Sequence, residues 1–296
     1  MTNANGTRET GTVLDRIVAV RRERLAEDQR TRSEADLRAR LASVPAPRDF
    51  AALLRSGTPA TPEGARVRLI AEIKRASPSK GVFDANLDAV DQASRYAFAG
   101  ASAISILTEP DFFRGSIEDL EAVATAFAGD SNRPALLRKE FIWDPYQLLE
   151  ARVFGADALL LIVMLLEPSL LVDLISRTRA FGMEHLIEIH DETELSIALD
   201  AGARVLGINN RDLRTFDEDL GTTERLAALA TSSSGEITLV AESAIRTSAD
   251  AARMAGAGAH ALLIGEALVT GSDVGSRARE FMIARSRDAA TSEVPS

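Results

Sequence analysis

Residues 155–190, GADALLLIVMLLEPSLLVDLISRTRAFGMEHLIEIH, contain two short apolar runs on either side of an amphipathic stretch. The runs are ALLLIV at 158–163 and HLIEIH at 185–190, and both have the length and composition of strands that are buried on both faces. An order of strand, helix and strand is typical of a parallel sheet whose strands are joined by helices.

The same alternation continues in both directions from this segment. Six further aliphatic runs occur, at 68–74, 103–107, 135–139, 205–209, 237–242 and 261–265. A Gly-Ala pair introduces four of the eight runs, because glycine ends a helix in a left-handed turn. Eight strands with eight helices predict a (βα)8 barrel over residues 66–284. An open doubly wound sheet is the alternative, since it uses the same turns.

Three amphipathic helices are expected before the barrel. The first begins after Thr12, the second is capped by Ser33 with Asp36, and the third carries Phe50 and Leu54. Residues 12–58 therefore form a predicted N-terminal helical extension. The polar ends of the chain, 1–11 and 285–296, are expected to be flexible tails.

The composition indicates a globular protein without a nucleic acid or membrane partner. The chain has 296 residues, and 34 basic against 44 acidic residues give a net charge of −10, which argues against binding by phosphate neutralisation. The longest apolar run, 158–166, is half of the roughly 18 residues that a transmembrane helix needs. The N-terminus does not resemble a secretion signal. The absence of cysteine excludes disulfides and thiol chemistry, which fits a cytoplasmic protein.

Polar side chains follow the ends of several predicted strands, where (βα)8 barrels place their active sites. These residues are Glu72, Lys74, Lys139, Glu188, Asn209, Arg211, Glu242 and Ser243. Because the carboxyl ends of all strands surround one opening, we expect these groups to meet there.

Glu72 and Lys74 are two residues apart, so both side chains should point toward the barrel axis. Glu188 lies between two isoleucines that would face the helices. A carboxylate inside a strand should have a raised pKa unless a cation such as Lys74 or Lys139 lies near it. A lysine beside a carboxylate favours acid/base catalysis. A buried ion-pair network without a catalytic task is the alternative.

The cations at the strand ends predict a positive opening for an anionic ligand in an otherwise acidic protein. Phosphate is the natural candidate. The turns after the last two strands are where such barrels often bind phosphate through backbone N–H groups. These turns are Glu242-Ser243-Ala244 and Gly265-Glu266-Ala267.

Segment 76–88, with Ser77 and Lys80, is either a lid over the opening or a passive loop. The three histidines lack the arrangement of a metal site, and we interpret them as core or surface residues. No nucleotide-binding motif or catalytic triad is present. The sequence therefore predicts neither a metal nor an organic cofactor.

Seven segments match one known family in the same order over residues 13 to about 283. They are LIAEIKRASPSKG, ISILTEPDFFRGS, LLRKEFIWDPYQLLEARVFGADALLLI, LIEIHDETEL, GINNRDLRTF, LVAESAI and LLIGEAL. On these segments the chain resembles the indole-3-glycerol phosphate synthase family. The resemblance implies a (βα)8 barrel whose N-terminal helical extension packs over the catalytic opening. It also implies a carboxy-lyase of tryptophan biosynthesis that closes 1-(2-carboxyphenylamino)-1-deoxyribulose 5-phosphate to an indole ring, with loss of carbon dioxide and water.

The resemblance also implies a role for each matching residue. Lys139 would be the general acid and Glu188 the general base of the dehydration, with Glu72 stabilising the cationic intermediate. Lys74 would pair with the anthranilate carboxylate, with Ser77 nearby. The other implied contacts are Asn209 and Arg211, which would orient the substrate, and Phe113, which would pack on its aromatic ring.

At the phosphate end the sequence departs from the family pattern. Ala244 stands where glycine is usual, and it removes conformational freedom beside an expected anion site. Glu266 stands where serine is also common, and its carboxylate would repel phosphate unless it turned away. We expect phosphate to bind backbone groups of Ser243, Ala244, Gly265 and Glu266, with weakened affinity.

Two other functions fit the residues. One is a different phosphorylated-sugar barrel, such as an isomerase or an aldolase that uses Lys139 as a Schiff-base nucleophile. The other is a barrel that has lost turnover and serves as a binding or scaffold protein. In each case the expected partner is a small anionic phosphorylated molecule, and the chain is expected to be a monomer or weak homodimer.

Overall fold

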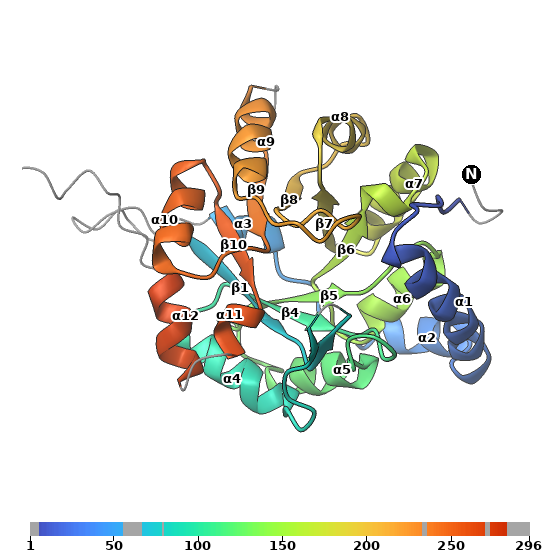
Figure 1. Cartoon of the computed structure of the whole chain (residues 1–296). Coiled ribbons are helices and arrows are strands. Elements are labelled where there is room, and N and C mark those ends of the chain that lie inside the picture. Colours follow the sequence, from blue (N-terminus) through green and yellow to red (C-terminus); the bar gives the residue numbers. More distant parts are fainter. Residues whose placement is uncertain (1–5, 56–66, 79, 233–235, 270–272, 283–296) are drawn as a thin grey trace, which may run out of the picture.

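The computed structural model describes residues 6–55, 67–78, 80–232, 236–269 and 273–282 (Figure 1). Eight parallel strands close into a barrel in the order β1-β10-β9-β8-β7-β6-β5-β4. The barrel strands are β1 (Arg68–Ile73), β4 (Ala103–Leu107), β5 (Ala135–Lys139), β6 (Ala158–Ile162), β7 (Glu184–Ile189), β8 (Val205–Asn209), β9 (Thr238–Glu242) and β10 (Ala261–Ile264). The predicted (βα)8 barrel is confirmed, and each predicted strand ends within one residue of its observed bounds.

Helices follow the strands and surround the barrel (Figure 1). They are α4 (Ala89–Ala99), α5 (Ile117–Ala126), α6 (Pro145–Val153), α7 (Pro168–Ala180), α8 (Glu192–Asp200), α9 (Gly221–Thr231), α10 (Ser248–Gly256), α11 (Glu266–Val269) and α12 (Val274–Met282), with a 3-10 turn at Val163–Leu165. Gly100, Gly155, Gly202 and Gly258 all have positive φ, as the Gly-Ala pairs predicted. None of the helices in the described ranges is both long enough and apolar enough to cross a membrane.

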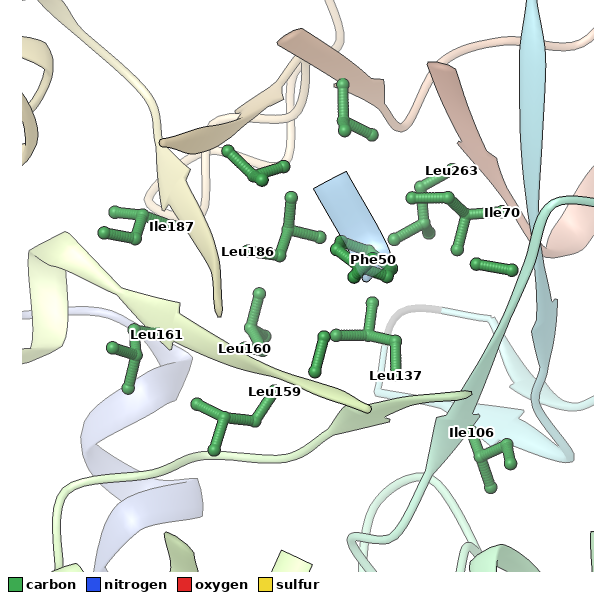
Figure 2. Close-up of a cluster of buried hydrophobic side chains, with 14 of the residues drawn as sticks. Phe50, Ile70, Ile106, Leu137, Leu159, Leu160, Leu161, Leu186, Ile187 and Leu263 are labelled. Atoms are coloured by element: carbon green, nitrogen blue, oxygen red, sulfur yellow. The ribbon is translucent and has the colours of Figure 1, made fainter. Parts of the chain in front are cut away.

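Strand alternation separates the inside of the barrel from the layer beneath the helices. Figure 2 shows Leu137, Leu160 and Leu186 pointing inward around the ring of Phe50, whereas Ile187 lies on the opposite side of its strand. All five side chains are almost completely buried. The expectation that Ile187 faces the helices is therefore confirmed, and Glu188 points into the barrel.

Segment 76–88 is more regular than a loop. It contains an antiparallel hairpin of β2 (Ala76–Ser77) and β3 (Gly81–Val82). Period-two patterning over so few residues is too short to identify a hairpin from the sequence.

The N-terminal extension contacts both ends of the barrel. Helix α1 (Val13–Thr31) lies over the mouth, meaning the opening formed by the carboxyl ends of the strands, where Leu14 and Ile17 line the central cavity. Helix α2 (Glu34–Leu41) packs beside α6, and α3 (Phe50–Arg55) lies at the opposite end. There Arg55 pairs with Glu236, just before β9. The first helix of the extension therefore covers the mouth. The third helix lies at the other end, where Phe50 fills the apolar bottom of the barrel.

Buried ion pairs attach α1 to the barrel next to the site. Arg21 lies 3.4 Å from Glu140, which directly follows β5. Arg138, on β5, lies 2.7 Å from Glu150 of α6, and Glu150 also pairs with Arg32 at 3.0 Å. Arg21, Arg138, Glu140 and Glu150 are all buried, so each charge depends on its partner.

Residues 6–8, which the sequence places in a flexible tail, are fixed against the barrel. Thr7 is buried and forms an antiparallel bridge with Leu166, and the N–H of Arg8 donates to the carbonyl of Leu165 at 2.8 Å. The tail was predicted from the polar composition of residues 1–11, and composition does not reveal hydrogen bonds between backbone groups. The predicted tail at 285–296 lies outside the described residues.

Replacing Phe50 with alanine should lower the free energy of unfolding by about 3–5 kcal/mol, because a large buried ring is removed from a packed layer. Urea denaturation followed by circular dichroism measures this change. The matched control is Phe98→Ala, since Phe98 is 89% exposed on α4 and its loss should change stability by less than about 0.5 kcal/mol. Equal effects of the two substitutions would contradict the role of Phe50 in closing the barrel.

Candidate active site

A cavity of about 400 Å³ opens at the mouth of the barrel. All thirteen site residues that the sequence predicted line it: Glu72, Lys74, Ser77, Phe113, Lys139, Glu188, Asn209, Arg211, Glu242, Ser243, Ala244, Gly265 and Glu266. They come from seven of the eight barrel strands or from the segments that follow these strands. The structure therefore brings together every candidate residue, because the carboxyl ends of parallel barrel strands share one opening.

Lys139 lies at the centre of this cavity, between carboxylates from two other strands. Its Nζ donates to Oε2 of Glu242 at 2.7 Å and to Oε2 of Glu188 at 3.4 Å. Nearby, Nζ of Lys74 lies 2.8 Å from Oε1 of Glu72, which confirms that this pair points the same way. Three buried carboxylates thus face two lysines.

Two glycines make room for these carboxylates. A Cβ on Gly207, in the middle of β8, would collide with Oε1 of Glu242. A Cβ on Gly265 would collide with Oε1 of Glu72. A glycine inside a strand often marks such a close approach, and this signal was present in the sequence.

The pKa values of the groups in this cluster are shifted in different directions. Burial opposes the charged form of Lys139, but Glu242, Glu188 and Glu72 outweigh it and raise the pKa of the ammonium group. Burial also raises the pKa of Glu242 above its usual range, and the neighbouring carboxylates add to this effect. For Glu188 and Glu72, burial is outweighed by the nearby cations, so the pKa of each of these carboxyls is lowered. Glu188 and Glu72 are therefore held as carboxylates, while Glu242 binds a proton more readily.

Further donors hold Glu188 on its other side. Nδ2 of Asn209 donates to Oε1 of Glu188 at 3.1 Å. Nε2 of His190 lies 3.4 Å from the same oxygen, and Glu194 of α8 contacts the other ring nitrogen of His190. The sequence reasoning missed His190 and Glu194, because they are joined across the boundary between a strand and a helix.

The part of the cavity near β1 and β4 is partly aromatic. The rings of Phe113 and Phe141 lie 6.1 Å apart between centroids at an angle of 42°. Lys74 lies 5.7 Å from the centre of the Phe83 ring, and Ser77 is buried beside it in β2. An aromatic carboxylate would find here both an apolar wall and a cation.

Arg211 is held at the opposite side by a carboxylate that the sequence reasoning also missed. Its guanidinium group donates to Oε1 of Glu218, with the shorter bond at 2.5 Å. The other oxygen of Glu218 pairs with Arg246, which lines the same end of the cavity together with Arg277. These two arginines add positive charge beside the predicted phosphate turns.

The phosphate turns have unusual backbone geometry. Ser243 and Ala244 have φ values of 64° and 62°, in the left-handed region that disfavours residues with a Cβ. Glu266 turns toward the hairpin, where its Oε1 lies 3.2 Å from Nζ of Lys80. This contact partly neutralises the carboxylate that the sequence suggested would repel an anion.

No group of three histidine or acidic side chains in the described ranges is arranged to hold a metal ion. The donor set at the mouth is instead composed of lysines paired with carboxylates. Such pairs can supply and accept protons, so the geometry supports acid/base chemistry on an anionic substrate.

Comparison with known proteins identifies one family over most of the chain. The family model for indole-3-glycerol phosphate synthase matches residues 14–281. An indole-3-glycerol phosphate synthase from Roseiflexus sp. (strain RS-1) is 48% identical over 271 residues, covering 91% of this chain and 98% of that protein. One from Parafrankia sp. (strain EAN1pec) is 46% identical, covering 88% of this chain and 91% of that protein.

A longer relative matches this chain in sequence, and a solved structure matches it in fold. A multifunctional tryptophan biosynthesis protein from Schizosaccharomyces pombe is 45% identical over 214 residues, which are 72% of this chain and 28% of that protein. A crystal structure of 3-hexulose-6-phosphate synthase matches 74% of this chain and all of that chain with a TM-score of 0.58. At 15% identity this structural match supports the barrel fold alone.

Replacing Ala244 with glycine should raise the free energy of unfolding by up to about 1 kcal/mol, because glycine adopts the left-handed region without the strain of a Cβ. Urea denaturation measures the change. Ala257→Gly is the matched control, since Ala257 ends α10 with a φ of −76° and glycine there should be neutral or destabilising. A loss of stability in Ala244→Gly equal to that of the control would show that the turn carries no such strain.

Proposed function

The chain belongs to the indole-3-glycerol phosphate synthase family, and on that premise we propose how its residues carry out the reaction. The chain is a carboxy-lyase of tryptophan biosynthesis. It closes 1-(2-carboxyphenylamino)-1-deoxyribulose 5-phosphate to indole-3-glycerol phosphate, with loss of carbon dioxide and water. The observation that carries the assignment of roles is the position of Lys139, partly buried in the cavity between Glu188 and Glu242.

Lys139 acts as the general acid. The ring carbon that bears the carboxylate attacks the ribulose carbonyl, and the ammonium group donates a proton to the carbonyl oxygen as negative charge develops there. The raised pKa of Lys139 keeps the proton on the amine until the substrate arrives. Glu242, at 2.7 Å and with a pKa raised by burial, is the neighbour that can return a proton to the lysine.

Glu188 acts as the general base. After carbon dioxide leaves, the new hydroxyl group takes a proton from Lys139, which Glu242 has reprotonated, and departs as water while a carboxylate removes a proton from the adjacent carbon. The cations around Glu188 lower the pKa of its carboxyl, so that it is in the basic form when the substrate binds. Asn209 fixes one of its oxygens and leaves the other facing Lys139.

The aromatic end of the substrate lies near β1 and β4. Lys74 pairs with the anthranilate carboxylate, Ser77 lies beside it, and Phe113 packs on the ring. Glu72, ionised and 2.8 Å from Lys74, keeps that lysine in place and stabilises positive charge on the intermediate.

The phosphate lies at the opposite end, near β9 and β10. Backbone groups of Ser243, Ala244, Gly265 and Glu266 bind it, and Arg211 orients the sugar side of the substrate. Arg246 and Arg277, which line this end of the cavity, support an anionic group there. The contact between Glu266 and Lys80 turns the carboxylate aside.

A Schiff-base aldolase is disfavoured by the same electrostatics. A lysine that attacks a carbonyl must be a neutral amine, and its pKa is lowered where it is activated. The carboxylates around Lys139 have the opposite effect and raise its pKa.

The chain works on a small phosphorylated substrate in the cytoplasm, without a metal or organic cofactor, as a monomer or weak homodimer.

The direct test adds the carboxyphenylamino-deoxyribulose phosphate to purified, chelator-treated protein and follows indole fluorescence. Product formation without added cofactor is the expected result. A folded protein that binds this substrate and yields no product would overturn the synthase assignment and favour the binding protein. An adduct trapped by borohydride on Lys139 would favour the aldolase.

Lys139→Ala should abolish measurable turnover, and Glu188→Gln should lower kcat by about 10²–10⁴-fold, because each removes a group that transfers a proton in the reaction. Steady-state kinetics measure both effects, with circular dichroism to confirm folding. The control is Arg177→Met, an exposed residue of α7 that pairs with Asp173 and lies outside the cavity lining, and it should retain most of the wild-type kcat. A near wild-type rate in either active-site variant would remove that residue from the mechanism.

A further inference from the structure

His190 is a buried histidine that directly follows β7, and the reaction scheme gives it no task. Oε2 of Glu194 accepts its backbone N–H at 2.9 Å and its ring Nδ1 at 3.0 Å. Glu194 is itself placed by the start of α8, where its N–H donates to the side chain of Asp191. One carboxylate from the neighbouring helix thus holds both the backbone and the ring of His190.

The other ring nitrogen of His190 faces the proposed base. Nε2 lies 3.4 Å from Oε1 of Glu188 and makes no hydrogen bond within the part of the chain that the structure describes. The same oxygen of Glu188 accepts from Asn209, whereas the other oxygen faces Lys139. The two carboxylate oxygens therefore have different surroundings: Oε1 is held, and Oε2 is presented to the reacting groups.

The ring contacts decide the protonation of the pair. Nδ1 carries a proton, because it faces a carboxylate that only accepts. A neutral ring would then present the lone pair of Nε2 to Oε1 of Glu188, and two acceptors at this distance repel each other. One further proton must lie on His190 or on Glu188. Lys139 and Asn209 favour the ionised form of Glu188, so the proton belongs on the histidine.

The charges around the pair agree with this conclusion. Burial disfavours a charged ring, but the carboxylates of Glu188 and Glu194 outweigh it and raise the pKa of His190 to about 10. The other charged groups facing this region are Lys139 from β5, Glu242 from β9, Glu72 from β1, and Asp191 with Arg214 beside α8. A charged His190 is a third cation beside Glu188 and Glu72, in addition to Lys139 and Lys74.

We propose that the imidazolium of His190, held by Glu194, is a positioning residue for catalysis: it keeps Glu188 ionised and fixes Oε1, so that Oε2 is the oxygen that removes the substrate proton. This inference rests on the proposed role of Glu188 as the general base. His190 does not touch the reacting atoms, and its effect passes through Glu188.

The kinetic test compares His190→Gln and Glu194→Gln with the wild-type enzyme over the accessible pH range. His190→Gln should lower kcat about tenfold with KM changed less than about twofold, because the substrate contacts remain. A nearby cation lowers the pKa of Glu188, so its loss raises that pKa. The acidic limb of the kcat/KM profile should therefore move upward by about one pH unit.

Glu192→Gln is the matched control. Glu192 lies two residues before Glu194 in the first turn of α8, but it is exposed and pairs with Arg225. It should leave kcat, KM and both limbs unchanged. A purely structural role for His190 would lower activity equally at all pH values, and an unmoved acidic limb in His190→Gln overturns the proposal.

An NMR titration of the histidine rings separates this inference from the synthase assignment, because it needs no substrate. The chain has three histidines, so the His190 signal is assigned by its loss in His190→Gln. The ring should remain doubly protonated above pH 8, and both Glu194→Gln and Glu188→Gln should lower its midpoint by more than about one unit. Titration near pH 6.5 in the wild-type protein would overturn the proposal even if the enzyme is active. An imidazolium in a protein without turnover would instead count against the proposed function.

Discussion

The placement of the partly buried Lys139 among three carboxylates is the interaction on which the mouth of the barrel depends. Taking an ammonium group out of water is unfavourable unless its charge is compensated, and here Glu72, Glu188 and Glu242 provide more than enough negative charge. The excess negative charge is compensated by Lys74 beside Glu72 and by the proton that we assign to His190 beside Glu188. The ends of β1, β5, β7 and β9 therefore contribute to a single electrostatic unit, and glycine in β8 provides the space that this unit needs.

The N-terminal extension shields part of this unit from solvent. Helix α1 covers the mouth with apolar side chains while Arg21 reaches Glu140, the neighbour of Lys139 in sequence. The extension then passes along α6 and ends with Phe50 in the bottom of the barrel, so it is attached at both ends. A cover attached in this way keeps the cluster in a medium of low dielectric constant, in which each proton affinity is strongly shifted.

Much of the fold and most of the site could be predicted from the sequence, because both follow from short-range periodicity. Aliphatic runs define the strands, alternation by two places Glu72 and Lys74 together, and the carboxyl ends of parallel strands share one opening. Features that depend on contacts between elements could not be predicted. The direction of Glu266 depends on a hairpin, the cover at the bottom depends on Phe50 meeting strands far along the chain, and the ordered residues 6–8 depend on pairing with Leu166.

His190 shows the same limit within the site and explains why it was interpreted as a core or surface residue. Its importance does not lie in its own position but in two contacts, one to the strand before it and one to the helix after it. Without the contact to Glu188, the ring would only be hydrogen-bonded to Glu194 at the start of α8. Without the contact to Glu194, it would be free to turn away from Glu188. Because both contacts exist, the chain can hold its base ionised beside a lysine that must give up its proton. Acid and base can then coexist in one cluster, since His190 is a third cation that favours the ionised form of Glu188.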